Sequence, residues 1–244
     1  MGLLPFYSIF LMDSLFYWNT RGACDSGLLR NLKVVCDGPK PIFIGLAETR
    51  CERETRFRCL ASLGFDGIGV SPSNGRSGGL VIAWKSAQIQ ISIIEQDRQF
   101  FHVLCEIPDR QTFMMTVVYV SPNIESRTQI WEKLKIISSS SSLPWIVMGD
   151  FNDILEATDR TGGARICHNR INWFQDRVSE CGLVDMGFKG PKFTWRGPLR
   201  PGCSRLYERL DRALCNSNFL TTFPDSFLKV LPRTKFSDHN PISL

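Results

Sequence analysis

The stretch WIVMGDFND, residues 145–153, decides how the rest of this chain is interpreted. Four apolar residues, two of them β-branched, run directly into Gly149, Asp150 and Asn152, which predicts a short strand buried on both faces and ending in polar groups. Asp150 or Asn152 could simply close an Asx turn after the strand. Alternatively, both belong to a site, because ligand-binding groups in layered α/β folds collect at strand ends.

Three other polar residues, Asn19, Glu48 and Tyr119, stand at or near the end of an apolar, strand-like run. Glu48 is the most informative of them, because a carboxylate at the end of the run IFIGLA would be poorly solvated without a partner. A hard divalent cation would supply that partner, since Mg²⁺ takes carboxylate, water and phosphate oxygens. We therefore expect these three residues to converge with Asp150 and Asn152 on one rim.

The segment SDHNP, residues 237–241, sets Asp238 beside His239, one of only three histidines in the chain. Asp211, within RLDRAL at 209–214, is an acid among apolar positions and could hold His239 in a defined tautomer. Together with the rim residues, this pair completes the groups that phosphodiester hydrolysis needs: a metal ligand, a water activator, phosphate donors and a histidine–aspartate pair.

Strand-like and helical patterns are interspersed along the chain. The strand-like runs lie at 15–18, 42–47, 80–84, 89–94, 101–107, 113–120, 145–148 and around Val230, and the helical patterns at 27–35, 52–60, 126–137 and 171–181. A serine run at 138–142 predicts a polar loop. These elements predict an α/β (α+β) fold of two packed sheets covered by helices. We expect one domain over residues 12–244, preceded by an apolar appendage at 1–11.

Composition limits the class of protein. With 43% hydrophobic and 22% charged residues the chain is globular, and a net charge of +5 suits a polyanionic partner without proving one. Nine scattered cysteines form no CxxC pair, which argues against a zinc site and a disulfide framework and favours a reducing compartment. The apolar N-terminus carries Pro5 and Asp13 and lacks a basic start, so we expect no signal peptide and no membrane span.

Basic residues gather between positions 189 and 212, with Phe193, Trp195 and Tyr207 interleaved. Cationic side chains pair with phosphates, and exposed aromatic rings stack on bases. For the aromatic residues a place in the core is an equally good interpretation, whereas for the basic residues phosphate contact is favoured. The candidate nucleic-acid contacts are Lys189, Lys192, Arg196, Arg200, Arg205 and Arg209.

Six short segments, in this order, resemble the motifs of the endonuclease/exonuclease/phosphatase superfamily: WNTRG (18–22), LAETR (46–50), VYVSP (118–122), GDFND (149–153), RLDRA (209–213) and SDHNP (237–241). Each is weak alone, but together they span almost the whole chain. The closest likeness is to the endonuclease domain of plant LINE-type, non-LTR retrotransposons, which LVDMGFKGPKFTW (183–195) and ERLDRAL (208–214) resemble.

The resemblance implies a four-layer α-β-β-α sandwich and a role for each matched residue. Glu48 would bind Mg²⁺, with Mn²⁺ as an alternative, assisted by Asn19 and Asp238. Asp150 would orient or deprotonate the attacking water, Asn152 would donate to the phosphate, and Tyr119 would contact the phosphate or the leaving oxygen. His239, held by Asp211, would stabilise the developing charge. One departure is Arg21, which stands where relatives acting on damaged DNA often carry an acid.

The function predicted on this basis is a metal-dependent DNA endonuclease whose nick leaves a 3′-hydroxyl and a 5′-phosphate. Two alternatives remain: a phosphatase acting on inositol phosphates or phospholipid head groups, and a catalytically inactive nucleic-acid-binding remnant of a retroelement. We expect DNA as the partner, no membrane and no obligate protein partner, a monomer, and a place in the nucleus or cytoplasm.

Overall fold

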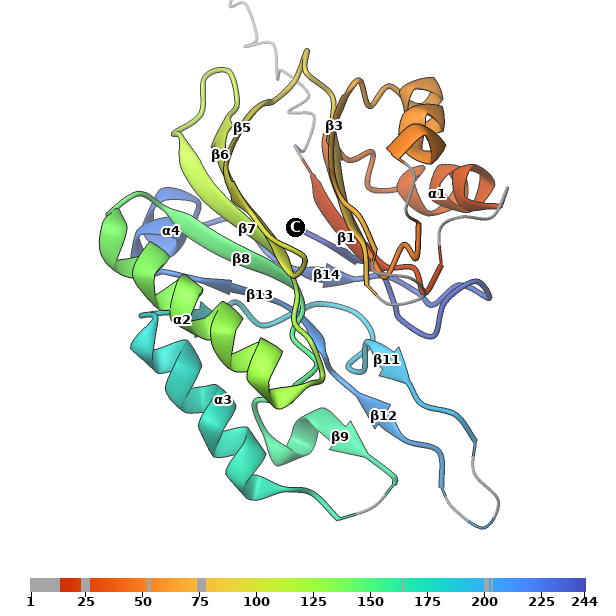
Figure 1. The fold of residues 1–244 in the computed structure, drawn as a ribbon, viewed down its shortest axis with the longest axis vertical. Helices are drawn as coiled ribbons and strands as arrows, with labels where there is room; N and C mark the ends of the chain where they lie inside the picture. Colours follow the sequence, from red (N-terminus) through yellow and green to blue (C-terminus); the bar gives the residue numbers. More distant parts are fainter. Residues whose placement is uncertain are drawn as a thin grey trace, which may run out of the picture.

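The computed structural model describes residues 14–22, 27–51, 54–73, 78–163, 165–199, 202 and 204–244. Two six-stranded sheets pack face to face, and helices cover the outer face of each sheet (Figure 1). The predicted four-layer α-β-β-α sandwich is therefore confirmed. The appendage predicted at 1–11 lies outside the described residues.

The first sheet has the strand order β14-β15-β1-β2-β4-β3. Only its β1–β2 pair is parallel. Helix α1 and the 3₁₀-helix η1 pack on its outer face (Figure 1). The bounds are β1 Leu15–Asn19, α1 Leu28–Cys36, β2 Phe43–Ala47, η1 Glu54–Leu63, β3 Gly67–Ser71, β4 Leu80–Trp84, β14 Lys229–Val230 and β15 Ile242–Ser243.

The second sheet has the order β10-β13-β8-β7-β6-β5, and its β7–β8 pair is parallel. Helices α2 and α3 cover its outer face. The bounds are β5 Gln90–Gln96, β6 Phe100–Glu106, β7 Phe113–Tyr119, α2 Ile124–Ser140, β8 Trp145–Asp150, α3 His168–Glu180, β10 Val184–Asp185, β13 Asp211–Cys215 and α4 Ser217–Thr222. A small third sheet contains β9 (Arg160–Thr161), β11 (Trp195–Arg196) and β12 (Tyr207–Glu208), and the short 3₁₀-helix η2 (Ala157–Asp159) precedes β9.

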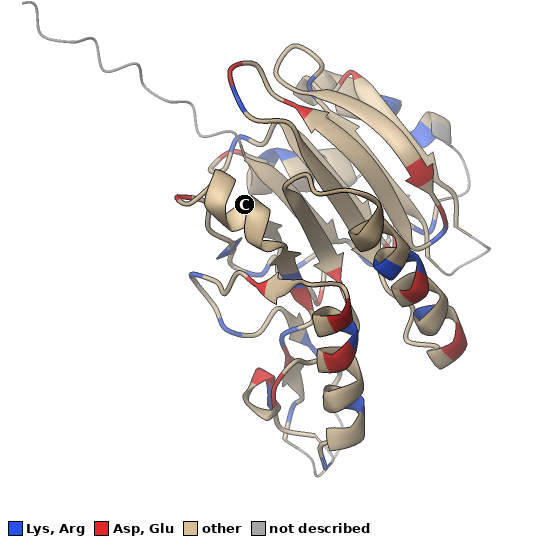
Figure 2. Cartoon of the chain, turned by 90° about the vertical axis from the view of Figure 1, so that its left-hand side faces the viewer, with Lys and Arg blue, Asp and Glu red and all other residues tan. Residues whose placement is uncertain are grey.

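The central strands are buried along their whole length because successive side chains enter different cores. On β1, Leu15 and Tyr17 lie in the core between the sheets, whereas Phe16 and Trp18 pack beneath α1 and η1. This two-sided burial explains why apolar runs without polar alternation form strands here. Figure 2 shows the consequence, since most of the length of the sheet strands is free of charged residues.

Some elements differ from the prediction. The predicted loop at 138–142 is wrong in its first half, because α2 continues to Ser140. The hydroxyls of Ser138, Ser139 and Ser140 donate to carbonyl groups three residues back, so this polar run closes the last helical turn. The pattern at 52–60 forms the 3₁₀-helix η1 rather than an α-helix. Within the described part of the chain, no helix is both long enough and apolar enough to cross a membrane.

Candidate active site

The strand register brings the predicted rim residues together. On β7, β8 and β13, Tyr119 pairs with Asp150, and Asp150 pairs in turn with Asp211, so these three residues stand abreast. In the other sheet Asn19 is level with Ala47, and Glu48 follows directly. The register thus brings together residues at the ends of five strands, three from one sheet and two from the other.

Glu48 is held by several donors. Its Oε1 accepts hydrogen bonds from Asn19 Nδ2 at 3.1 Å and from the Tyr119 hydroxyl at 3.1 Å, and its Oε2 accepts one from Arg50 at 2.9 Å. Burial alone would raise the pKa of Glu48, but the bonds from Asn19, Arg50 and Tyr119 outweigh it and hold the pKa below its ordinary value. Glu48 is therefore a fixed anion at neutral pH.

The backbone at the rim is unusual. Arg21, Glu48, Arg50 and Asn152 all have a positive φ, between 47° and 52°, in a region that residues with a side chain rarely adopt. Four of the six non-glycine residues with this conformation among the described residues therefore lie at the site. Such strain persists only where the surroundings enforce it, and it gathers at functional sites.

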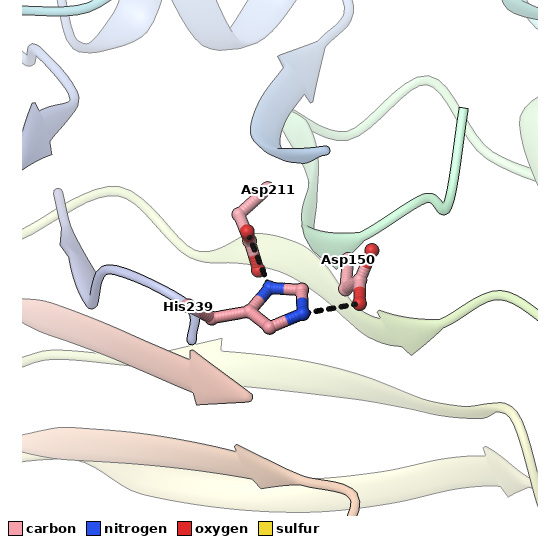
Figure 3. A group of neighbouring side chains, drawn as sticks. All are labelled: Asp150, Asp211 and His239. Atoms are coloured by element: carbon pink, nitrogen blue, oxygen red, sulfur yellow. Dashed lines mark hydrogen bonds and ion pairs between the residues drawn. The ribbon is translucent and has the colours of Figure 1, made fainter. Parts of the chain in front are cut away.

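Asp150, Asp211 and His239 form a buried cluster (Figure 3). His239 Nδ1 lies 2.9 Å from Asp211 Oδ2, and its Nε2 lies 3.9 Å from Asp150 Oδ2. Two carboxylates opposite each other on paired strands repel. The imidazole between them relieves that repulsion when both ring nitrogens carry a proton.

The charges of this cluster shift each other's titration. Burial alone would lower the pKa of His239, but the carboxylates of Asp211 and Asp150 outweigh it and raise the pKa to about 9. Burial and the nearby Asp211 carboxylate raise the pKa of Asp150 to about 7, although His239 and the Asn19 amide act in the opposite direction. At neutral pH the cluster therefore holds a protonated imidazole beside a carboxyl group that can take up a proton.

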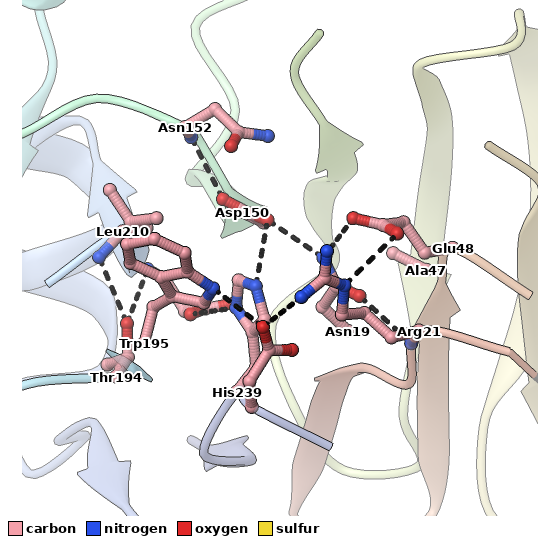
Figure 4. Close-up of polar contacts among 12 residues, drawn as sticks. Asn19, Arg21, Ala47, Glu48, Asp150, Asn152, Thr194, Trp195, Leu210 and His239 are labelled. Atoms are coloured by element: carbon pink, nitrogen blue, oxygen red, sulfur yellow. Dashed lines mark hydrogen bonds and ion pairs between the residues drawn. The ribbon is translucent and has the colours of Figure 1, made fainter. Parts of the chain in front are cut away.

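Asn19 connects the two halves of the site (Figure 4). Its Nδ2 donates both to Glu48 and, at 2.9 Å, to Asp150 Oδ2. Its Oδ1 accepts the backbone N–H of Arg21 at 3.2 Å. In this arrangement the amide orients two carboxylates, and its oxygen retains one lone pair for a further partner.

Asn152 is fixed by its neighbours. Its backbone N–H donates to Asp150 Oδ1 at 2.9 Å, which is the Asx-type turn predicted as the structural alternative. Its Nδ2 donates to the carbonyl of Val120 at 2.8 Å. An amide nitrogen carries two hydrogens, so one is left for a substrate phosphate.

Sequence reasoning missed several residues that complete the site. Trp195 Nε1 donates to Asp238 Oδ2 at 3.0 Å, and Trp195 forms an isolated bridge with His239. The Ser237 hydroxyl donates to the carbonyl of Asn19 at 2.7 Å and accepts the N–H of His239 at 3.0 Å. From sequence, Trp195 is expected only to stack on bases or to lie in the core. Ser237 gives no signal in the sequence, because its contact with Asn19 depends on the fold.

The donor set fits a divalent cation such as Mg²⁺. Glu48 and Asp238 offer carboxylate oxygens and Asn19 an amide oxygen, which are the hard ligands that this ion prefers. Asp238 Oδ1 is buried without a hydrogen-bond partner, as an oxygen that awaits an ion would be. The neighbouring Asp150, Asp211 and His239 could also offer ligand atoms within 4.8 Å of one another, but His239 Nδ1 is already engaged by Asp211.

The predicted nucleic-acid residues divide into two groups. Lys189 and Lys192 are exposed, and Arg196 and Arg205 are partly exposed, so all four remain candidate phosphate contacts. Arg209 does not, because it is buried and its guanidinium donates to Asp185 Oδ1 at 2.8 Å. Arg200 lies outside the described residues.

A hollow of about 750 Å³ adjoins the rim at Tyr119. Its lining mixes polar side chains such as Arg98 and Lys133 with apolar ones such as Phe100 and Ile130. Of the site residues only Tyr119 lines it, so the hollow meets the site at the Tyr119 side.

Comparison with known proteins identifies the family of the chain and finds solved structures with the same fold. Residues 16–239 match the model of the Endonuclease/Exonuclease/phosphatase family. No curated protein matches the sequence significantly. The identities to the solved structures below are at most 17%, so these likenesses show a shared fold.

Three solved structures illustrate the shared fold. The AP endonuclease LMAP from Leishmania major has a TM-score of 0.69 and 17% identity, with 95% of this chain and 86% of that chain covered. An AP endonuclease from Archaeoglobus fulgidus has a TM-score of 0.68 and 17% identity, with 95% and 98% covered. The endonuclease domain of TRAS1, a telomere-specific non-LTR retrotransposon, has a TM-score of 0.66 and 16% identity, with 95% and 96% covered.

Proposed function

The chain belongs to the endonuclease/exonuclease/phosphatase family, and from this premise we propose that it is a divalent-metal-dependent DNA endonuclease. The observation that carries the proposal is the placement of His239 between Asp211 and Asp150, with Asn19 linking Asp150 to Glu48. The nick leaves a 3′-hydroxyl and a 5′-phosphate.

Asp150 acts on the attacking water. Its carboxylate is held by Asn19 and by the backbone N–H of Asn152, so it faces the site in one orientation. A pKa raised to about 7 makes it a base that can take a proton near neutral pH. The water oxygen then bonds to phosphorus, the bond from phosphorus to the 3′ oxygen breaks, and that oxygen takes a proton from solvent to become the 3′-hydroxyl.

His239 stabilises the charge that develops on the phosphate oxygens. Asp211 fixes the ring through Nδ1, and the raised pKa keeps Nε2 protonated and able to donate. A cation that is oriented in advance and held away from water stabilises a transition state strongly. Asn152 completes the cradle with its free amide hydrogen, and the Tyr119 hydroxyl would turn from Glu48 to contact the phosphate or the leaving oxygen.

Glu48 and Asp238, with the amide of Asn19 beside them, would hold Mg²⁺ or Mn²⁺. When bound, such an ion neutralises phosphate charge and orients the scissile group. The chain's own contribution is to keep Glu48 ionised and positioned through Asn19, Tyr119 and Arg50.

DNA is the proposed substrate because exposed and partly exposed cations lie around this site and a hollow adjoins it at Tyr119. Lys189, Lys192, Arg196 and Arg205 supply candidate phosphate contacts, and Lys133 and Arg98 line the hollow beside Tyr119. The solved structures with this fold include endonucleases, one of them from a retrotransposon. We extend the proposal to a retroelement origin, a monomer, and a reducing compartment in the nucleus or cytoplasm.

The test is a nicking assay on supercoiled plasmid with purified protein, comparing Mg²⁺ with EDTA and wild type with Asp150→Ala. Relaxed circles that require both the metal and Asp150 support the proposal. A folded wild-type protein that cuts nothing with any divalent metal rejects it. Release of inorganic phosphate from inositol phosphates would then indicate a phosphatase, and retained DNA binding without cleavage would indicate an inactive binding module.

A further inference from the structure

Arg21 turns its side chain back into the site that the polar rim encloses. Its guanidinium donates through Nη1 to Asp238 Oδ2, and its Nε lies 4.0 Å from Glu48 Oε2. Figure 4 shows the guanidinium beside the Glu48 carboxylate. A single cation therefore bridges two carboxylates that come from opposite ends of the chain.

The backbone holds Arg21 in this position. Its φ is 49°, a conformation that costs free energy for a residue with a side chain, and its N–H donates to Asn19 Oδ1. The turn that begins at Asn19 thus directs the side chain inward. About half of the Arg21 side chain, 47%, is exposed, so the guanidinium can leave toward solvent without unpacking the core.

The two carboxylates that Arg21 bridges are those assigned above to the divalent ion. Without Arg21, Arg50 would still offset the charge of Glu48, but no cation would stand between Glu48 and Asp238. A guanidinium and a divalent ion cannot both occupy the space between the same two carboxylates. Like charges so close would cost free energy even if sterics allowed both.

We infer that Arg21 is a resident counter-ion that a divalent metal must displace, so that this side chain lowers the metal affinity of the protein. The inference rests on the proposed function, since it uses the same metal site. Arg21 would then stabilise Glu48 and Asp238 when no metal is bound, and would raise the metal concentration needed to fill the site.

The experiment measures Mn²⁺ binding by calorimetry in the intact chain, without substrate. Wild type is compared with Arg21→Met, which keeps the length but removes the charge, and with Arg21→Gly, which also relieves the positive φ. Both variants should bind Mn²⁺ at least about threefold more tightly than wild type, in keeping with the modest strength of half-exposed ion pairs. The control Arg30→Met removes the same charge from an exposed position on α1 and should leave the affinity unchanged.

Thermal unfolding gives a second readout that does not involve catalysis. In EDTA, Arg21→Met should melt below wild type because Asp238 has lost its cation and Glu48 keeps only Arg50, and saturating Mn²⁺ should remove the difference. Equal Mn²⁺ affinity in wild type and both Arg21 variants overturns the inference alone. Absence of Mn²⁺ binding in all of them overturns the metal site and the inference together.

Discussion

Glu48 has no role in the core, yet hydrogen bonds from three side chains fix its carboxylate. We predict that Glu48→Ala lowers plasmid nicking about a thousandfold, the scale of losses at catalytic positions, without unfolding the domain. The measurement is initial rates of relaxed-circle formation, with circular dichroism as the check on folding. The matched control is Glu106→Ala, exposed at the end of β6 and outside the hollow, which should cut like wild type. Activity within tenfold of wild type in Glu48→Ala would contradict the assignment.

His239 is the histidine of the cluster in Figure 3, where it lies between Asp211 and Asp150. His239→Ala should reduce nicking by a factor similar to that of Glu48→Ala, because it removes the protonated imidazole that stabilises the charge on the phosphate oxygens. His168→Ala is the control, since His168 is exposed in the first turn of α3. If the two histidine variants cut at the same rate, the role given to His239 is wrong.

The titration of His239 can be tested in metal-free protein by NMR of the imidazole ring. We predict a pKa near 9 in wild type and a clearly lower one in Asp211→Asn, because Asp211 is the main group that raises it. A raised folded-state pKa contributes stability that is fully present below the unfolded value of about 6.5 and is lost as the pH rises through about 9. An unchanged titration in Asp211→Asn would exclude Asp211 as the cause.

Strand β8 approaches β7 closely at Gly149, the residue before Asp150. A Cβ at this position would lie 2.0 Å from the carbonyl oxygen of Val118 on β7. Gly149→Ala should therefore force the β7–β8 pair apart and cost about 2–3 kcal/mol of unfolding free energy, as overpacking does. Urea denaturation measures the cost. Gly38→Ala is the control, because nothing lies within 4 Å of a Cβ there, and a loss as large as that of Gly149→Ala would refute the steric explanation.

The elements best predicted from sequence are those whose pattern follows directly from burial. The runs that form β1, β2, β7 and β8 are apolar on both faces, because one face packs on the other sheet and the other face packs on helices. Strand β13 was not predicted, because Asp211 and Arg212 interrupt its apolar pattern and only their buried partners explain them. The end of α2 was missed because serine propensity favours loops, whereas here the hydroxyls bond to the helix itself.

For the site, the sequence predicted the polar residues that follow strands and the histidine–aspartate pair. The sequence could not predict which basic residues are exposed to solvent and which pair with buried acids. Arg209 looked like a phosphate contact, but it pairs with Asp185 and stacks on Phe188 with its guanidinium 4.4 Å from the ring centre. Charge alone does not distinguish a solvated cation from one that neutralises a buried acid.

One buried ion-pair network ties the second sheet to the loops around the site. Arg212, fully buried on β13, donates to Asp185 Oδ2 at 2.6 Å and also to Asp159, and Arg209 donates to Asp185 Oδ1. Asp185→Asn should cost about 2 kcal/mol at pH 7, since bonds to charged groups are worth about that much. Urea unfolding tests this, and Asp225→Asn, an exposed acid, is the control.

The same network predicts how stability depends on pH. Burial raises the pKa of Asp185, but Arg212 and Arg209 outweigh it and leave the pKa below its ordinary value. A depressed folded-state pKa contributes stability above the unfolded value of about 3.9 that is lost as the pH falls through the folded one. The difference in unfolding free energy between wild type and Asp185→Asn should therefore be constant above about pH 5 and shrink in more acidic buffer. A difference that stays constant down to pH 3 would argue against the ion pair.

Strand β1 lies against β15, with the backbone N–H of Leu15 bonded to the carbonyl of Leu244, and Ser237 bonds to Asn19. Groups from both ends of the domain therefore have to meet before Asn19, Asp150 and His239 can act together. During synthesis on the ribosome, the growing polypeptide would carry Asn19 and Glu48 long before His239 emerges. We expect such nascent chains to be unable to cut DNA until almost the whole domain has been made and folded.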